Sequence, residues 1–388
     1  MKVRSTLLAL VTAVAVAGLT AGCGSSSSSS TTTASAAANT GTSSTAAASS
    51  STPSWLAAAQ SATSQAEQVP TAILQTPLGS FKPKSSGTIF HVACNLALEG
   101  CTKLANGIKA GTLAIGYQFK LCNGGTTANQ INECFTQAIA AHPTAIVVNG
   151  IGESDAANSF AAAAKAGVPI VGSFTGDSPG INGVVTEVAG NTCAQQAKTV
   201  ANAIIADSKG KANVLWVGTN TYTCNIQRQQ GFLDQMKTCP TCTVKTLSFA
   251  IDAITSQLPS QLQSALQSNP NLTYVVGTFD AVALAATQAI RQAGKADSIK
   301  VAGFDGDAPD LQLVKEGSIQ MWDDVTGGGE PGYAAVDAAA RHAVNKQVPK
   351  VTDITTMLVT KSNYSQIAPA YQGPSGYEQQ FKQLWGKG

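Results

Sequence analysis

The sequence predicts an α/β fold in which two lobes each contain a doubly wound parallel sheet. Two observations lead to this prediction. Short runs rich in β-branched residues alternate with Ala-, Gln- and Lys-containing stretches at helical spacing, which is typical of parallel strands joined by right-handed helical crossovers. Roughly ten such strands are expected, which is long for one open sheet, and a chain of 388 residues is long enough for two lobes.

Strands are expected where β-rich runs are bounded by turn residues, and helices where apolar residues recur at helical spacing. The expected strands are 88–93, 145–149, 169–173, 183–188, 213–218, 244–250, 272–278, 299–304, 318–322 and 355–359. The expected helices are 54–69, 101–115, 127–141, 154–166, 192–206, 228–237, 254–268, 281–293, 309–316 and 331–345. Ser154 and Asp280 are good N-cap residues at two helix starts, and Gly167 and Gly294 stand at two helix ends.

Residues 1–22 have the pattern of a bacterial secretion signal. Lys2 and Arg4 give a short positive start, residues 7–19 are apolar or small apart from one threonine, and small residues then lead to Cys23. This apolar run is too short to span a hydrocarbon core of about 30 Å comfortably. We therefore expect the protein to be exported from the cytoplasm.

Cys23 is the expected site of a lipid anchor. Residues 19–23 resemble a lipobox, where a lipoprotein signal is cut and the new N-terminal cysteine is acylated. The alternative is an ordinary secretion signal with a chance cysteine near its end. Residues 24–52 are almost entirely Ser, Thr, Ala and Gly and cannot bury enough apolar surface to fold. A tether and arm over 23–85, anchored to the cell membrane, is therefore favoured.

The charge balance and the composition argue against nucleic acid as a partner and against a metal site. The formal net charge is +2 and no Lys/Arg run stands out, so a nucleic-acid partner is not expected. His91, His142 and His342 are scattered, and no second CxxC follows the first at zinc spacing, so no metal site is expected. We expect a monomer that carries no cofactor.

Apart from Cys23, the chain has an even number of cysteines, which in an exported protein indicates disulfides. They are Cys94, Cys101, Cys122, Cys134, Cys193, Cys224, Cys239 and Cys242. Eight cysteines allow about 105 connectivities, and pairing in sequence order is the simplest of them. The pair 239–242 has the spacing of a redox CxxC, but it closes an expected helix instead of opening one. A structural link at a helix–strand turn is favoured there.

The residues that directly follow the expected strands are the first candidates for a ligand site. In doubly wound sheets a ligand binds outside the carboxyl ends of the strands. These positions are Asn95, Asn149-Gly150, Phe174-Thr175, Asn220 to Tyr222, Asp252, Phe279-Asp280, Asp305-Gly306 and Asp323-Asp324, with Arg228 close by. Aromatic faces combined with a few fixed polar groups suit a small polyhydroxylated or amphipathic ligand.

Several motifs carry a resemblance to a known family. They are Tyr-Val-Val-Gly-Thr-Phe-Asp at 274–280, Gln-Ala-Gly at 292–294, Val-Ala-Gly-Phe-Asp-Gly at 301–306 and Arg-Gln-Gln-Gly-Phe at 228–232. Over 87–359 the chain resembles the type I periplasmic binding proteins of the ribose and galactose class, the solute receptors of ABC sugar importers. The resemblance implies that Asp305 and Arg228 contact the ligand, and that Phe279-Asp280 stands at a further binding corner.

The resemblance also implies an architecture and a partner. Two similar lobes would be joined by a hinge of three chain crossings, with 86–189 plus 326–355 in the N-terminal lobe and 190–325 plus 356–388 in the C-terminal lobe. Closure of the lobes on a small ligand would present a surface to an ABC permease in the membrane.

This sequence departs from the ribose pattern at three places. No aromatic pair follows the first strand, Phe174-Thr175 stands where an Asp-Arg pair is usual, and Phe279 replaces the corner Asn. A plain ribose receptor is therefore not expected, and sugar is only the family's default ligand. The expected ligand-binding residues are Asn95, Phe174, Thr175, Arg228, Phe279, Asp280 and Asp305. Several of these residues also have a structural alternative. Phe174 and Phe279 could belong to the core, and Asp305 could be a turn residue. Asp280 could be a helix cap, and Arg228 could be a surface residue.

Two other functions stay open. One is a sensory receptor that signals to a membrane partner, with a small and aromatic ligand as one option. The other is a secreted α/β enzyme, but the sequence has no Gly-x-Ser-x-Gly elbow and no phosphate loop. Residues 149–155 resemble half of a dinucleotide fingerprint, in which Asp155 takes the place of the third glycine and would repel a pyrophosphate.

Overall fold

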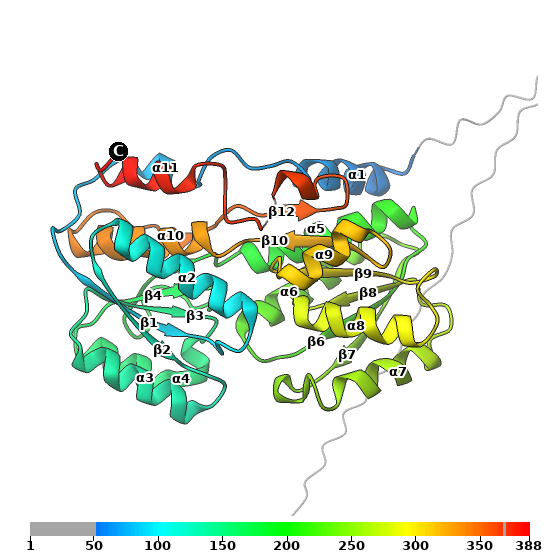
Figure 1. Ribbon diagram of the computed structural model, residues 1–388, viewed down its shortest axis with the longest axis horizontal. Coiled ribbons are helices and arrows are strands. Elements are labelled where there is room, and N and C mark those ends of the chain that lie inside the picture. The colour runs from blue at the N-terminus through cyan, green and yellow to red at the C-terminus, as the bar shows by residue number, and fades with distance from the viewer. Residues whose placement is uncertain (1–51, 368–369) are drawn as a thin grey trace, which may run out of the picture. The chain divides into compact units, whose positions relative to one another are not determined.

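The structure, a computed structural model, describes residues 52–367 and 370–388. The expected signal and Cys23 lie outside these residues. The chain from residue 52 onward forms two parallel-stranded lobes (Figure 1). No helix in the part of the chain described is long and apolar enough to cross a membrane.

The first lobe is built on a six-stranded sheet of order β11-β5-β4-β3-β1-β2, in which all neighbours are parallel. Its strands are β1 (Thr88–Ala93), β2 (Gln118–Asn123), β3 (Ala145–Asn149), β4 (Ile170–Ser173), β5 (Val184–Val188) and β11 (Val351–Thr352). Its helices are α2 (Glu99–Ala114), α3 (Ala128–Ala140), α4 (Glu153–Lys165), α10 (Gly329–Ala343) and α11 (Tyr377–Leu384).

The second lobe repeats the plan with the order β12-β10-β9-β8-β6-β7, in which β12 alone is antiparallel to its neighbour. Its strands are β6 (Asn213–Gly218), β7 (Thr243–Ser248), β8 (Tyr274–Gly277), β9 (Lys300–Phe304), β10 (Gln320–Val325) and β12 (Met357–Val359). Its helices are α1 (Ser54–Ala66), α5 (Thr192–Ser208), α6 (Thr223–Met236), α7 (Leu258–Ser268), α8 (Asp280–Gln292) and α9 (Ala308–Glu316). Three short 3₁₀ turns complete the described chain: η1 (Thr76–Leu78), η2 (Ile251–Ala253) and η3 (Tyr364–Gln366).

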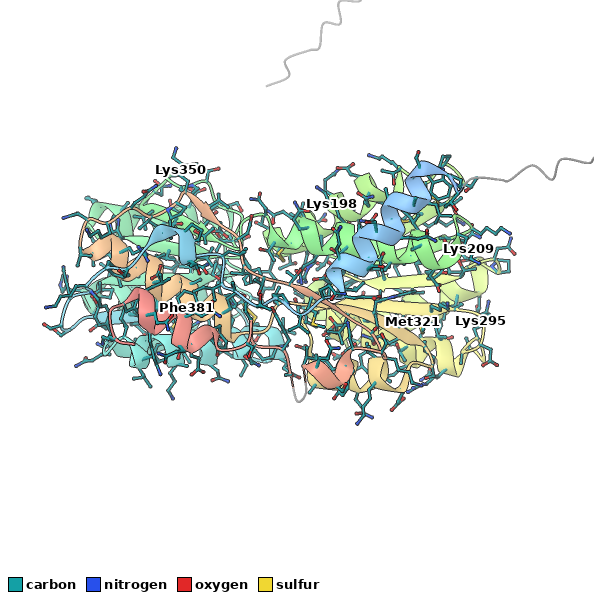
Figure 2. The ribbon with its side chains drawn as sticks, turned by 90° about the horizontal axis from the view of Figure 1, so that it is seen from above. Lys198, Lys209, Lys295, Met321, Lys350 and Phe381 are labelled. Carbon is teal, nitrogen blue, oxygen red and sulfur yellow. A yellow bond between two sulfur atoms is a disulfide. The ribbon has the colours of Figure 1, made fainter. Side chains whose placement is uncertain are left out.

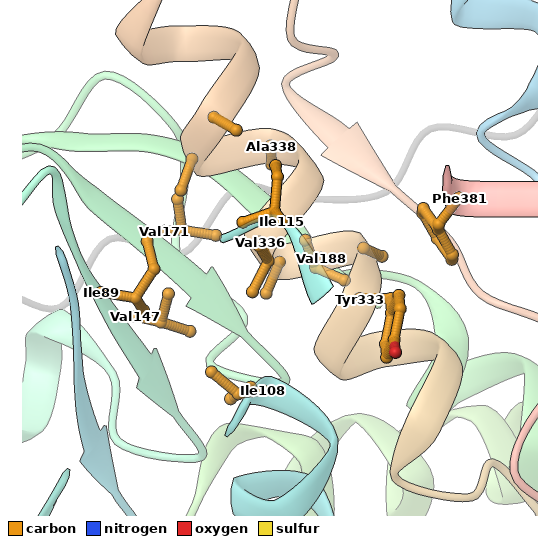
Figure 3. Close-up of a cluster of buried hydrophobic side chains, with 14 of the residues drawn as sticks. Ile89, Ile108, Ile115, Val147, Val171, Val188, Tyr333, Val336, Ala338 and Phe381 are labelled. Carbon is orange, nitrogen blue, oxygen red and sulfur yellow. The ribbon is translucent and has the colours of Figure 1, made fainter. Parts of the chain in front are cut away.

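Both faces of each sheet are buried, which makes the two sheets doubly wound. In the first lobe Ile89, Val147 and Val171 point toward α2 and α10, as Figure 3 shows. The adjacent residues Phe90 and Ile146 point to the opposite face, against α3 and α4. Successive side chains of a strand alternate between faces, so strands of continuous apolar residues are suited to a sheet covered on both sides.

Helices α2 and α10 approach each other closely because glycine lies at their contact. A Cβ atom on Gly107 of α2 would overlap the carbonyl group of Gly328, and one on Gly332 of α10 would overlap the backbone of Gly107. This close approach fixes α2, whose first turn reaches the space between the lobes.

The described cysteines pair in sequence order, as the simplest prediction had it. The four disulfides are Cys94–Cys101, Cys122–Cys134, Cys193–Cys224 and Cys239–Cys242. The last one lies between the end of α6 and the start of β7. It therefore has the position of a structural link rather than that of a redox motif at a helix start.

Ten of the twelve strands were expected, and β2 and β11 were not. β2 is an edge strand with four exposed residues out of six, so it has no continuous apolar run. β11 has only two residues. Helix α6 begins at Thr223, more than one turn before the expected start at Arg228. The N-cap of α8 is Phe279, not Asp280, and that of α4 is Gly152, not Ser154.

The chain crosses between the lobes five times within the described residues, not three. Three crossings follow β5, β10 and β11, as the resemblance implied. The arm adds one, because α1 packs on α5 of the second lobe whereas Ile73 and Phe81 lie in the core of the first. The tail adds another between η3, which contacts α9, and α11, which contacts α10.

The tail therefore corrects one predicted lobe boundary. Residues 356–388 were assigned to the second lobe, and β12 does pair there. Helix α11 instead packs on the first lobe, where Phe381 and Trp385 lie against Tyr333 of α10. Figure 2 shows Phe381 on one lobe and α1 along the other, close to Lys198 and Lys209.

The arm and the tail are hydrogen-bonded to each other on both lobes, one bond on each side of the hinge. The side chain of Gln380 accepts a hydrogen bond from the Ile73 N–H (3.1 Å), and that of Asn363 donates one to the Glu67 carbonyl (3.1 Å). Buried Glu330 of α10 accepts the N–H of Thr355 on another crossing (3.1 Å). The hinge is thus a layer of interconnected segments.

Candidate functional site

The carboxyl ends of both sheets face a cavity of about 310 Å³ between the lobes. We call it the interlobe cavity. Its apolar lining includes Ala97, Leu98, Leu104, Phe174, Tyr222, Phe279, Ala281, Leu284 and Pro309, and its polar lining Glu99, Lys103, Asn149, Asn225, Arg228, Asp305, Asp307, Asp310 and Thr326. The strand order reverses beside β1 in the first sheet and beside β6 in the second. Ligands bind at such reversal points in doubly wound folds.

Four of the seven expected ligand-binding residues line the interlobe cavity. They are Phe174, Arg228, Phe279 and Asp305. The other three lie outside its lining: Asn95 holds the turn after β1 (3.1 Å to the Ala97 N–H), Thr175 is buried against Glu187, and Asp280 is buried behind the loop after β9.

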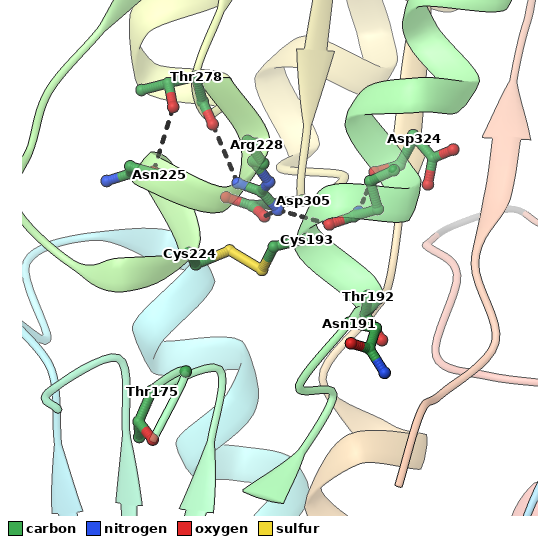
Figure 4. The surroundings of a disulfide bond; sticks show 12 residues. Thr175, Asn191, Thr192, Cys193, Cys224, Asn225, Arg228, Thr278, Asp305 and Asp324 are labelled. Carbon is green, nitrogen blue, oxygen red and sulfur yellow. Dashed lines mark hydrogen bonds and ion pairs between the residues drawn. A yellow bond between two sulfur atoms is a disulfide. The ribbon is translucent and has the colours of Figure 1, made fainter. Parts of the chain in front are cut away.

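Arg228 and Asp305 form the polar centre of the cavity (Figure 4). Arg228 is 2% exposed, and its guanidinium donates to an oxygen of Asp305 (2.5 Å), the Thr278 carbonyl (3.0 Å) and Gln196 (2.8 Å). It also lies 4.7 Å from the ring centre of Phe304. A buried charge requires such pairing, so Arg228 is fixed in place and orients the Asp305 carboxylate.

Three residues of the cavity wall have a left-handed backbone conformation that side-chain-bearing residues rarely adopt. Their φ angles are +57° at Phe174, +67° at Tyr222 and +97° at Asp305. Each stands in the turn that follows a strand. Backbone strain of this kind is concentrated at functional sites, which supports the interlobe cavity as the site.

The first turn of α2 contacts the loop after β9 in the other lobe. The Lys103 ammonium group donates to the Asp305 carbonyl (2.8 Å) and pairs with the Asp307 carboxylate (2.8 Å). The Glu99 carboxylate accepts the Ala308 N–H (3.0 Å). We call these interactions the α2–loop contact. Because glycine stands at position 100, the Asp305 carboxylate lies against the α2 backbone with no side chain between them.

The opposite rim is closed by small residues against the start of α6. No room exists for a side chain on Gly176 beside the methyl group of Thr223, and Gly150 lies against Cys94 and Tyr222. The lobes therefore touch on both sides of the cavity.

Disulfides from both lobes border the cavity. Cys94–Cys101 joins the end of β1 to the first turn of α2, and Asn149 donates to the Cys94 sulfur (2.8 Å). Cys193–Cys224 joins the starts of α5 and α6. These links restrict the two helix starts that carry Lys103 and Arg228.

A group of buried carboxyl groups lies behind the loop after β9. Burial raises the pKa of Asp280 well above its usual value, and the charges of Asp323 and Asp310 raise it further. Burial also raises the pKa of Asp310 and of Asp323. The Asp280 carboxylate accepts the Asp307 N–H (2.6 Å), so this group supports the loop that carries Asp305. Among residues 52–367 and 370–388, no His, Cys, Asp and Glu group has the arrangement of a metal site.

The expected ligand-binding set lacked several residues of the wall. Asn149 and Tyr222 were among the strand-end candidates but were not included in that set. Glu99 and Lys103 lie inside a helix, one turn apart, and no local signal marks them. Their role depends on the approach of the other lobe.

The comparisons with known proteins agree with this geometry. The profile of the periplasmic binding protein domain matches residues 93–347. This chain belongs to the periplasmic binding protein family. Among curated proteins, it is similar to the D-apiose import binding protein of Actinobacillus succinogenes, with 30% identity over 207 residues. The match covers 52% of this periplasmic binding protein and 64% of that relative.

Solved structures of solute-binding proteins show the same fold. An Agrobacterium vitis protein with bound allitol has a TM-score of 0.65 at 21% identity, covering 73% of this chain and 98% of that one. A second protein of that organism, with bound α-D-tagatopyranose, has a TM-score of 0.65 at 23% identity and covers 73% and 96%. A Mycobacterium smegmatis protein with bound glycerol has a TM-score of 0.65 at 22% identity and covers 74% and 99%. These relatives are substrate-binding proteins, not enzymes.

Proposed function

We propose that this protein is a lipid-anchored receptor that captures a sugar or polyol in the interlobe cavity and delivers it to an ABC importer. The Arg228–Asp305 pair is the observation that carries the proposal. A buried guanidinium holds a carboxylate at the strand ends, and part of that carboxylate remains open to the cavity, since the Asp305 side chain is 25% exposed. A charged acceptor of this kind is suited to a ligand hydroxyl.

The relatives support the ligand class. One carries D-apiose import in its name, and two solved structures hold allitol and α-D-tagatopyranose. The proposal of a lipid anchor is based on Cys23 and its flanking sequence. The proposal of delivery to an importer is based on the family to which the chain belongs.

Thermal unfolding of the purified protein with a panel of sugars and polyols tests the binding function. A ligand at about 100 times its Kd adds about 2.7 kcal/mol of apparent stability, so a binder raises the melting temperature. Asp305→Ala should abolish that rise, whereas Asp252→Ala, an exposed carboxylate of the same lobe, should retain it. If no sugar or polyol shifts the melt, or if Asp305→Ala binds normally, the proposal is wrong.

Two cell experiments test the rest of the proposal. Cys23→Ala should abolish incorporation of a labelled fatty acid into the protein, and labelling as strong as that of the wild type would contradict the anchor. Cells that lack the protein should lose high-affinity uptake of the sugar that binds. Unchanged uptake with a lost transcriptional response would favour a sensor.

A further inference from the structure

We propose that the interlobe cavity selects an uncharged sugar with an apolar face, of which 6-deoxy sugars are the simplest examples, and rejects anionic sugars. This inference rests on the proposed function and narrows its ligand class. It follows from which polar groups of the wall are already bonded, from the charges around the cavity, and from the apolar side chains that complete the wall.

Most polar side chains of the wall are bonded to protein. Asn149 accepts the Cys94 N–H (3.3 Å) and donates to the Cys94 sulfur. Asn225 donates to the Thr221 carbonyl (2.7 Å) and accepts from the Thr278 hydroxyl (3.3 Å). Each of these two amides thus has its oxygen and one of its two N–H groups engaged with protein, which leaves one N–H on each. Few partners therefore remain for a sugar with a full set of hydroxyls, and a buried hydroxyl without a partner is unfavourable.

The main charged acceptor that remains for a ligand is Asp305. One Asp305 oxygen is bonded to Arg228, and its partner oxygen lies beside Gly100 at the edge of the cavity. On the Arg228 guanidinium, Nε has no protein partner, and Nη1 uses only one of its two N–H groups, on the Thr278 carbonyl. A ligand must therefore offer a few donors at one edge, as hydroxyl groups do.

The charges around the cavity disfavour an anion. Within residues 52–367 and 370–388 the wall carries two cations, and both are paired: Arg228 with Asp305 and Lys103 with Asp307. Glu99 adds a further carboxylate. Wall carboxylates thus outnumber wall cations, and an anionic ligand enclosed there would meet like charge at low dielectric.

The rest of the wall is apolar and comes from both lobes. Leu98 and Leu104 of the α2 segment contribute from the first lobe, and Phe279, Leu284 and Pro309 from the second. Such a surface favours a methyl group or a bare ring face over a hydroxyl, because the apolar contact removes hydrocarbon from water. The wall therefore has a polar edge at Asp305 and apolar faces elsewhere.

Calorimetric titration with matched sugars tests the inference. We would compare D-galactose, D-fucose and D-galacturonate, which share stereochemistry and differ at carbon 6, and likewise the D-glucose and L-mannose series. In each series that binds, we expect the 6-deoxy sugar to bind at least tenfold more tightly than its parent, and the uronate to show no binding. A parent that binds as tightly as its 6-deoxy form, or a uronate that binds, overturns the inference but leaves the proposed function intact. Absence of binding in every series overturns the inference, whereas the proposed function is overturned only if the wider panel of sugars and polyols also fails to bind.

A variant pair tests whether the apolar wall causes the preference. Leu284→Gln adds a hydrogen-bonding group to the wall and should shift the 6-deoxy to parent affinity ratio toward the parent by at least threefold. Leu113→Gln makes the same change at a 57% exposed position of α2 outside the cavity and should leave the ratio unchanged. An unchanged ratio in Leu284→Gln would count against the proposed origin of the selectivity.

Discussion

Replacing Lys103 by methionine should weaken ligand binding by removing the α2–loop contact. Lys103 belongs to the first lobe, and its ammonium group lies 2.8 Å from both the carbonyl of Asp305 and the carboxylate of Asp307 in the second. Burial lowers the pKa of Lys103, but the nearby carboxylates, Asp307 foremost, raise it by more, so the side chain is charged. Methionine keeps most of the side-chain volume and removes the charge.

The size of the effect follows from how far the pair is shielded. The Lys103 and Asp307 side chains are 16% and 14% exposed, so the pair lies between an exposed ion pair, worth about 0–1 kcal/mol, and a buried charge-assisted bond, worth about 1.5–3 kcal/mol. Because these bonds join the two lobes, opening of the lobes would break them. A ligand that requires closure would therefore lose their contribution in Lys103→Met. A coupling of about 1–3 kcal/mol corresponds to a loss of roughly 5–150-fold in affinity.

Titration of a sugar that binds the wild-type protein into Lys103→Met measures this loss of affinity directly. The matched control is Lys109→Met, which changes an exposed lysine of the same helix. Because Lys103 also borders the cavity, a lost ligand contact would produce the same weakening. The exchange of charges in Lys103→Asp with Asp307→Lys separates the two causes, since it should recover part of the affinity only if the interlobe pair matters. Wild-type affinity in Lys103→Met would refute the reasoning.

Two further predictions concern stability. Replacing Cys193 and Cys224 by alanine should lower the free energy of unfolding in urea by about 3–4 kcal/mol, because the two cysteines are 31 residues apart. The same replacement of Cys239 and Cys242, which are 3 residues apart, should lower it by about 2 kcal/mol. Equal losses would argue against the loop-entropy explanation. Burial raises the pKa of Glu187 from 4.5 to about 8, so between these values the folded state holds more protons than the unfolded chain and the free energy of unfolding should fall as pH rises. Glu187→Gln should make that fall shallower in melts at pH 5 to 8, and an identical slope would show that this carboxyl is not its source.

The central strands could be predicted because their burial is encoded locally. Residues 88–93, 145–149 and 213–218 are apolar runs bounded by turns, and the structure has strands at these bounds. Strand β2 escaped prediction because an exposed edge strand has no continuous apolar run. The lobe on which helix α11 packs was predicted wrongly, because it is set by contacts of Phe381 with residues far away in the sequence.

The candidate site could be predicted only in part. Strand ends identified Asp305, Phe174 and Phe279, since the carboxyl edge of a parallel sheet is known once its strands are. They did not reveal that Asp280 points behind the loop, because side-chain direction in a helix's first turn depends on packing. Lys103 was missed for a different reason: its partners belong to the other lobe, and one sequence gives no measure of lobe approach.

The arm and the tail end on different lobes, and this has a practical consequence. Helix α1 packs on α5 of the second lobe, whereas α11 packs on α10 of the first. A donor fluorophore fused before residue 52 and an acceptor fused after residue 388 would therefore each follow the lobe on which its helix is packed. Rotation of the lobes would change the energy transfer between them. The native connectivity thus allows a labelled protein to report movement of the lobes without insertion into a loop or circular permutation.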